Sequence, residues 1–390
     1  MRRQLGWACL WAGILGAVLL FLSVQPLAFS VLQDFDAQAG RAAEARLAGR
    51  LPEAAELYRQ LVERRPDWQE GRWFLGTILY DQGKYDEALQ VFQDMVARWP
   101  YHGPAVGLIG LCQFQRKEYE RALLNFQKGH VLGFGQNPAL ISTIRYHAAI
   151  VLNRLGRYEA AYTTLKAFPL ENTRSRKILL AFGLSVLQMP YLPEETPVDK
   201  EAVVMAAGTA AYEAEHGNRQ QAEEMYRRLI ADFPTEPNVH YAYGRFLLAL
   251  DPGPALEQFE KELEISPGNV SVLVQIALEY IQEGRFAEAR PYAERVVAAS
   301  PRLYRGHNAL GQVLLETGDT EGSIRELERS IELEPLSPES HFLLARAYLK
   351  IGRKDDAQRE RAEFKRLYDL KAQADKEILG PRPAPSPPER

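Results

Sequence analysis

Residues 69–100, which read QEGRWFLGTILYDQGKYDEALQVFQDMVARWP, decide the fold of this chain. Apolar residues recur at helical spacing on both sides of Gly83. In the second segment Ala88, Phe92 and Met95 stand at positions i, i+4 and i+7, so they share one helix face. Gly83 ends the first helix and Pro100 prevents the second from continuing. The stretch therefore predicts a hairpin of two helices.

The same pattern returns every 34 residues along most of the chain. A small alanine is followed four residues later by an aromatic residue in three successive units, and glycines and prolines repeat at the same interval in the second half. The residues that carry the period are Ala54, Ala88 and Ala122, then Gly284, Gly318 and Gly352, and then Pro267, Pro301 and Pro335. A period of this length predicts stacked hairpins that share one elongated core.

The repeated hairpin resembles the tetratricopeptide repeat, whose signature is W-x2-L-G-x2-Y, then A-x3-F, then P. Leu75-Gly76, Ala88, Phe92 and Pro100 match it in the quoted unit. The resemblance implies an all-α, right-handed superhelical solenoid of about nine hairpins. These begin near Phe35, Gln69, Gly103, Ser142, Val203, Pro237, Val270, Tyr304 and Pro338, and the signature tryptophan is replaced by Arg72, His240, His307 or His341 in several of them.

One region breaks the repeat and divides the expected solenoid. Residues 172–202 contain one expected helix, from Arg176 to about Gln188, followed by three prolines within eight residues, which oppose a helix. We expect a helix and a proline-rich connector here, between an N-terminal array (35–171) and a C-terminal array (203–379). The alternative is a degenerate hairpin that leaves the superhelix continuous.

The two ends of the chain carry separate expectations. Arg2 and Arg3 precede an apolar stretch from Leu5 to Val24, so residues 1–32 are expected to form a signal peptide, cleaved after Ser30, or an uncleaved transmembrane anchor. Both alternatives place the repeats outside the cytoplasm. At the other end, a helix from Gln358 to about Leu379 is expected to cap the last hairpin, and residues 380–390 are expected to form a disordered tail.

Composition and motifs argue against catalysis and nucleic-acid binding. The 390 residues carry 47 Lys plus Arg against 51 Asp plus Glu, so no strongly basic field is available for phosphates. The sequence has no glycine-rich phosphate loop, no paired-cysteine motif and no His-Glu-x-x-His helix. We therefore expect no catalytic residues, no cofactor and no metal. Cys112 reads as a small buried residue.

Histidine recurs at one repeat position, in His240, His307 and His341. Equivalent atoms of neighbouring hairpins should lie about 8–10 Å apart, whereas the ligands of one zinc ion lie about 2 Å from the metal. These histidines are therefore expected to pack between hairpins.

The resemblance also implies a peptide-binding groove, lined by one face of the first helix of each hairpin. Projecting the family's groove positions onto this sequence gives a set of aromatic, amide and arginine side chains. Such a set suits an extended peptide, although some of the aromatics could instead pack between repeats. The candidate groove residues are Trp73, Tyr80, Phe114, Tyr146, Tyr241, Arg245, Asn308, Gln312, Phe342 and Arg346.

These observations predict a non-enzymatic scaffold in the bacterial cell envelope that binds a protein or peptide in its groove. The expected location is periplasmic or secreted, or anchored in the inner membrane through the N-terminal segment. A substrate-binding or regulatory subunit of an envelope enzyme complex is the alternative. The charge balance and the apolar N-terminal segment both oppose a nucleic-acid partner.

Overall fold

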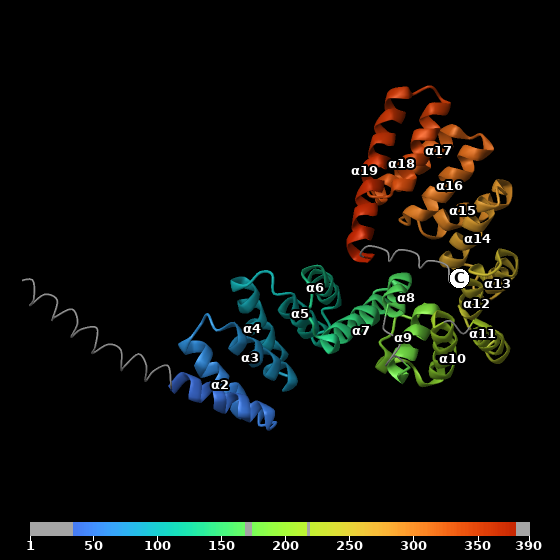
Figure 1. The fold of residues 1–390 in the computed structure, drawn as a ribbon. Coiled ribbons are helices and arrows are strands. Elements are labelled where there is room, and N and C mark those ends of the chain that lie inside the picture. The colour runs from blue at the N-terminus through green and yellow to red at the C-terminus, as the bar shows by residue number, and fades with distance from the viewer. Residues whose placement is uncertain (1–33, 168–173, 217–218, 380–390) are drawn as a thin grey trace, which may run out of the picture. The chain divides into compact units, whose positions relative to one another are not determined.

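The computed structural model describes residues 34–167, 174–216 and 219–379, which are α-helical apart from turns and one short 3-10 helix, with no strand in these ranges. The signal or anchor expected over residues 1–32 and the expected tail lie outside them. Within the described ranges, no helix is both long enough and apolar enough to cross a membrane. Internal contacts divide the chain into two units, residues 1–197 and 198–390, which are described separately (Figure 1).

The first unit contains four hairpins and an additional helix. A helix over residues 34–47 pairs with α2, since Arg64 of α2 bonds to Gln38 and Asp34. Each later first helix packs on its own second helix and on the second helix of the hairpin before it. The helices are α2 (Leu51–Arg64), α3 (Gln69–Asp81), α4 (Tyr85–Arg98), α5 (Gly103–Gln115), α6 (Tyr119–Leu132), α7 (Pro138–Arg154), α8 (Tyr158–Lys166) and α9 (Arg176–Val186), followed by η2 (Pro193–Glu195).

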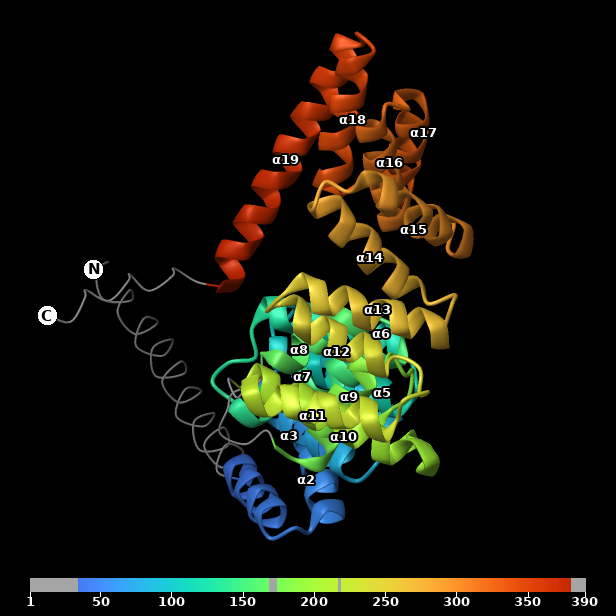
Figure 2. The same ribbon diagram turned by 90° about the vertical axis from the view of Figure 1, so that its right-hand side faces the viewer.

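The second unit contains five hairpins that pack in the same way. Its helices are α10 (Val198–Glu215), α11 (Arg219–Asp232), α12 (Val239–Leu248), α13 (Pro252–Ile265), α14 (Val270–Gln282), α15 (Phe286–Ala299), α16 (Tyr304–Thr317), α17 (Thr320–Leu333), α18 (Pro338–Lys350) and α19 (Lys354–Leu379). Figure 2 shows α19 running along α18 and continuing past it. The described residues thus contain nine hairpins, as the period predicts.

The structure corrects three of the expected boundaries. α9 packs on α7 and α8, so it belongs to the first unit and is not part of a free connector. The second array begins with α10 at Val198, five residues before the expected position. The last helix begins at Lys354 and is the second helix of the final hairpin, so it is not a separate cap.

Glycine and aromatic residues pack together inside several of the hairpins. The aromatic side chains that follow the small alanine, including Phe92, are fully buried. A Cβ atom added at Gly76 of α3 would lie 2.6 Å from the ring of Phe92 on α4, and one added at Gly244 would lie 2.5 Å from Phe259. Only glycine permits this approach, because packed interiors leave no room for an extra methyl group.

A polar contact replaces the signature tryptophan. Nε of Arg72 donates to the carbonyl oxygen of Pro66 at 2.9 Å, and Nε2 of His307 and of His341 lies 3.0 and 3.2 Å from the carbonyl oxygens of Pro301 and Pro335. Each acceptor stands six residues before the side chain that contacts it. The signature position therefore ties the first helix to the preceding loop.

The second ring nitrogen of each of these histidines contacts the second helix. Nδ1 of His307 lies 2.7 Å from Glu326, Nδ1 of His341 lies 2.6 Å from Glu360, and Nδ1 of His240 lies 2.8 Å from Gln258. The three histidines are buried. The structure corrects the expectation that they pack between hairpins, because each contacts the second helix of its own hairpin. No group of three or more metal-binding side chains occurs within the described residues.

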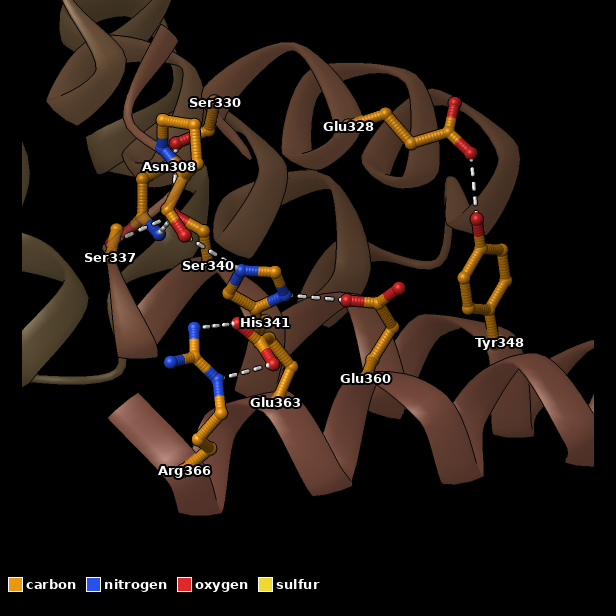
Figure 3. A network of polar contacts seen from close by, with 11 residues as sticks. Asn308, Glu328, Ser330, Ser337, Ser340, His341, Tyr348, Glu360, Glu363 and Arg366 are labelled. Atoms are coloured by element: carbon orange, nitrogen blue, oxygen red, sulfur yellow. Dashed lines mark hydrogen bonds and ion pairs between the residues drawn. The ribbon is translucent and has the colours of Figure 1, made fainter. Parts of the chain in front are cut away.

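Successive hairpins meet through small residues that differ from one junction to the next. Between α15 and α16, a Cβ atom added at Gly306 would lie 2.5 Å from Val296. At the next junction, between α17 and α18, the residues equivalent to Val296 and Gly306 are Ser330 and Ser340. Their hydroxyl oxygens lie 2.9 Å apart, and Ser340 also contacts Ser337 at 3.0 Å (Figure 3). These two junctions therefore use different pairs of residues.

Candidate functional site

Each unit has a candidate site of its own, its first-helix face, by which we mean the surface formed by α3, α5 and α7 in the first unit and by α12, α14, α16 and α18 in the second. Several of these helices contact one another directly, as α5 does α7, α14 does α16 and α16 does α18. The first helices therefore form a layer of their own within each unit, and residues spaced along that layer can meet one ligand.

An open cavity of about 340 Å³ lies beside Trp73 in the first unit, and we call it the Trp73 pocket. Its lining residues are Gln69, Glu70, Trp73, Met95 and His102. The half-buried indole ring lies 5.5 Å from the imidazole of His102 and 6.0 Å from the ring of Phe92. Met95 is fully buried at the back. These contacts hold the indole in place before any ligand arrives.

The pocket carries little positive charge. Nδ1 of His102 accepts a hydrogen bond of 3.0 Å from the backbone N–H of Ala105 and thereby caps α5. Burial lowers the pKa of His102, so its ring is neutral at neutral pH and carries its hydrogen on Nε2. The exposed carboxylate of Glu70 stands in the first turn of α3, where it complements the helix dipole.

Tyr80 and Tyr146 are half-buried in the first unit. Gln115 donates a 3.4 Å hydrogen bond to the Tyr80 hydroxyl, and the Tyr146 ring lies 5.0 Å from Nζ of Lys177 on α9. Burial raises the pKa of both tyrosines, so both hydroxyls stay protonated and can donate.

Phe114 and Tyr241 lie inside the layers, where they supply packing rather than groove surface. Phe114 is 8% exposed and its ring lies 4.8 Å from that of His147, while Tyr241 is 5% exposed and lies 5.9 Å from Phe259. The prediction that these two side chains line a groove is wrong, because both are buried. The exposed Arg245 donates to the Tyr241 hydroxyl at 3.2 Å.

The polar candidates in the second unit join neighbouring first helices. Nδ2 of Asn308 donates to Ser340 at 2.8 Å, and the Arg346 guanidinium pairs with Glu316 at 2.7 Å. Gln312 is half-buried on α16 and lies between Asn308 and Glu316 along the sequence. Phe342 is 44% exposed, which makes its ring the most accessible apolar surface among the predicted groove residues.

Sequence reasoning missed part of the Trp73 pocket. Met95 comes from a second helix and His102 from the loop before α5, so a projection of first-helix positions alone does not include them. The quoted stretch offered a signal, since Met95 lies in the last turn of α4, close to the loop over residues 99–102.

Comparison with known proteins adds the family. Tetratricopeptide repeat profiles match residues 39–103, 205–235, 274–330 and 308–375. A curated relative, cellulose synthase operon protein C of Xanthomonas axonopodis pv. citri (strain 306), is 29% identical over 150 residues. The match covers 36% of this chain and 10% of the relative, so the chain spans about a tenth of that protein's length.

Solved structures of MamA are similar in part. The fragment from residue 41 to the end of MamA from Desulfovibrio magneticus RS-1 is 21% identical, with a TM-score of 0.39 over 44% of this chain and 97% of that one. A double mutant of MamA RS-1 is 18% identical, with a TM-score of 0.40 over 43% and 96%. The repeat profiles fall in both units and together match half of the sequence, and the chain belongs to the tetratricopeptide repeat family.

Proposed function

We propose that this protein is a non-enzymatic scaffold of the bacterial cell envelope that binds an extended segment of a partner protein on its first-helix face. The Trp73 pocket is the observation that carries the proposal. It is a preformed recess of about 340 Å³, which exceeds the volume of one large side chain, and its back is apolar.

The chemistry of the pocket and its neighbours suits a peptide. A buried aromatic or aliphatic side chain of the partner would contact Trp73, and anchors of this kind supply most of the binding free energy at interfaces. Tyr80 on the same helix offers a hydroxyl group to a backbone carbonyl of the partner. Tetratricopeptide repeats are interaction modules, which supports a protein partner over a small molecule.

The envelope location rests on the sequence of residues 1–32. Two arginines followed by about twenty apolar residues favour export with the repeats outside the cytoplasm. Intact mass of the protein from membrane and soluble fractions tests this proposal. A mass lacking residues 1–30 supports a signal peptide, an uncleaved mass in the membrane fraction supports an anchor, and an uncleaved mass confined to the cytoplasm contradicts export.

A second candidate is a subunit that positions substrate or partners within an envelope enzyme complex. The curated relative favours it, since its name assigns that protein to a cellulose synthase operon. The two candidates differ in what copurifies with the chain. A polysaccharide synthase recovered in fixed ratio would favour the second, and varied non-enzymatic partners would favour a general scaffold.

Crosslinking from the pocket tests the binding face directly. A photoreactive residue placed at Gln69, at the edge of the pocket, should crosslink to a discrete partner in intact envelopes. Combining it with Trp73→Ala should reduce the crosslinked product at least tenfold, because the anchor is lost.

The matched control is Leu124→Ser on the second helix α6, where the side chain is 65% exposed. This control should leave the crosslinked product unchanged. Equal crosslinking by the Trp73→Ala variant, with its melting temperature unaltered, would exclude the Trp73 pocket as the binding site.

A further inference from the structure

Three aromatic residues form an exposed strip at the last hairpin. Phe342 of α18 is 44% exposed and Tyr368 of α19 is 59% exposed, with the half-buried Phe364 between them. Ring centroids lie 5.4 Å apart between Phe342 and Phe364, and 5.8 Å apart between Phe364 and Tyr368. These distances are typical of aromatic pairs in contact, so the three rings make one continuous apolar surface, which we call the aromatic strip.

Among the described residues of the preceding hairpins, the strip has no counterpart. The aromatic residues that close those hairpins, such as Phe92 and Phe259, are fully buried. α19 has 26 residues, whereas α17 has 14, and Leu370 on its continuation is also 49% exposed. Clustered apolar surface of this kind is costly in water and marks a docking surface.

A suitable occupant follows directly in the sequence. Residues 381–390 read PRPAPSPPER, and five of these ten residues are proline. Proline has no backbone N–H and a fixed φ, which favours the polyproline II conformation. Segments of this kind bind aromatic-lined surfaces, because the stiff helix loses little entropy and its rings pack on the aromatic faces.

The length of the segment matches the distance to the strip. Tyr368 and Phe364 precede Gly380 by twelve and sixteen residues, which along an α-helix is about 18 Å and about 24 Å. Ten residues in polyproline II span about 31 Å. Gly380 stands at the point where the chain would have to reverse, and glycine accepts the backbone conformations that a tight reversal requires.

We propose that residues 381–390 fold back along α19 and dock on the aromatic strip of the same chain. The tail covers Tyr368 and Phe364 first and reaches toward Phe342. This intrachain contact shields the last hairpin, and it shares no residue with the partner site proposed at Trp73, which belongs to the first unit.

The test uses the full chain and a synthetic peptide of residues 381–390 that carries a fluorophore. In a tail variant, the five prolines of residues 381–390 are replaced by serine, which keeps the length and removes the docking segment. Fluorescence anisotropy should show that the tail variant binds the peptide at least tenfold more tightly than the unaltered chain, whose own tail occupies the strip.

The second part of the test replaces residues of the aromatic strip in the tail variant and repeats the peptide titration. Tyr368→Ser combined with Phe342→Ser should abolish peptide binding, whereas Tyr101→Ser, an equally conservative change at an 85% exposed tyrosine of the first unit, should leave it unchanged. Circular dichroism before titration confirms that each variant is folded.

Three outcomes would overturn the proposal. The first is a tail variant that does not bind the peptide, and the second is peptide binding that survives the double replacement. The third is equal binding by the unaltered chain. Light scattering adds a further criterion, since a molecular mass that doubles with concentration only when the prolines are present would assign the strip to the tail of a second copy.

Discussion

Nδ1 of His341 on α18 lies 2.6 Å from Oε2 of Glu360 on α19, and this contact joins the two helices of the last hairpin. The other ring nitrogen lies 3.2 Å from the carbonyl oxygen of Pro335. The same pair of contacts recurs at His307, with Glu326 and Pro301. A single buried side chain thus ties the first helix both to its second helix and to the loop before it.

Replacing His341 should show how much this side chain contributes to the stability of the protein. We expect His341→Ala to lower the free energy of unfolding by about 2 kcal/mol, because two buried polar contacts are lost and a charged acceptor is left unpaired. His341→Arg should recover a large part of the loss, since Arg72 occupies the same repeat position and donates to the equivalent carbonyl. Urea denaturation measures both values, and equal losses for the two variants would contradict the assignment.

Glycine at the helix contact should be irreplaceable. Gly76→Ala places a methyl group 2.6 Å from the Phe92 ring and is expected to destabilise the protein by about 1–3 kcal/mol. Gly40→Ala is the matched control in the same unit, because no atom lies within 4 Å of the added carbon and the residue stands inside a helix. It should stabilise by about 0.5–1 kcal/mol. Melting temperatures that shift in the same direction for both would refute the packing argument.

Glu262 should make the protein less stable as the pH rises, which is the opposite of the usual effect of a carboxylate. This fully buried carboxylate accepts hydrogen bonds from the backbone N–H groups of Asn238 at 2.8 Å and of Tyr241 at 3.3 Å. Burial nevertheless raises the pKa of Glu262 above its ordinary value of 4.5, because desolvation outweighs these bonds. Its contribution to stability is therefore fully present below about pH 4.5 and is lost as the pH rises through the elevated pKa of the folded state.

The variant Glu262→Gln removes this titration. We expect its melting temperature, relative to that of the unaltered protein, to increase between pH 4.5 and pH 7.5. Differential scanning calorimetry at several pH values measures the difference. A difference that stays constant or falls over this range would show that the carboxylate is not held in its neutral form by burial.

Cys112 should be chemically inert in the folded protein. Its side chain is fully buried on α5, and burial raises the pKa of the thiol to about 12. In a Cys9→Ser chain, we expect a thiol reagent at pH 8 to leave Cys112 unmodified until the protein unfolds. Gln127→Cys, at an exposed position of α6, provides a thiol that should react at once. Rapid modification of Cys112 in native conditions would contradict the burial.

The repeat architecture is predictable from the sequence because it depends on local patterns. Glycine, alanine and aromatic residues at a 34-residue interval specify which helices pair and how closely. The end of the array was less predictable, since a helix that caps a hairpin and one that completes it share the same apolar period. The position of α19 depends on the contact between His341 and Glu360, which spans two helices.

The candidate site was less predictable than the fold. Asn308 and Arg346 occupy groove positions, yet each finds a partner on a neighbouring helix about 30 residues away. A single repeat does not reveal such a partner, because it depends on the stacking of the next one. Tyr241 is buried for a different reason, since the ring of Phe259 on the second helix of its own hairpin offers it an apolar contact.

The paired small residues at the hairpin junctions bear on how such an array can be rebuilt. Val296 faces Gly306, whereas the equivalent residues one repeat later are Ser330 and Ser340. Moving the final hairpin into the place of the one before it would set a serine Cβ against Val296, at the 2.5 Å separation that Gly306 avoids. The repeats are therefore not interchangeable. Shuffling or duplicating them requires that the residues on both sides of each hairpin junction be exchanged together.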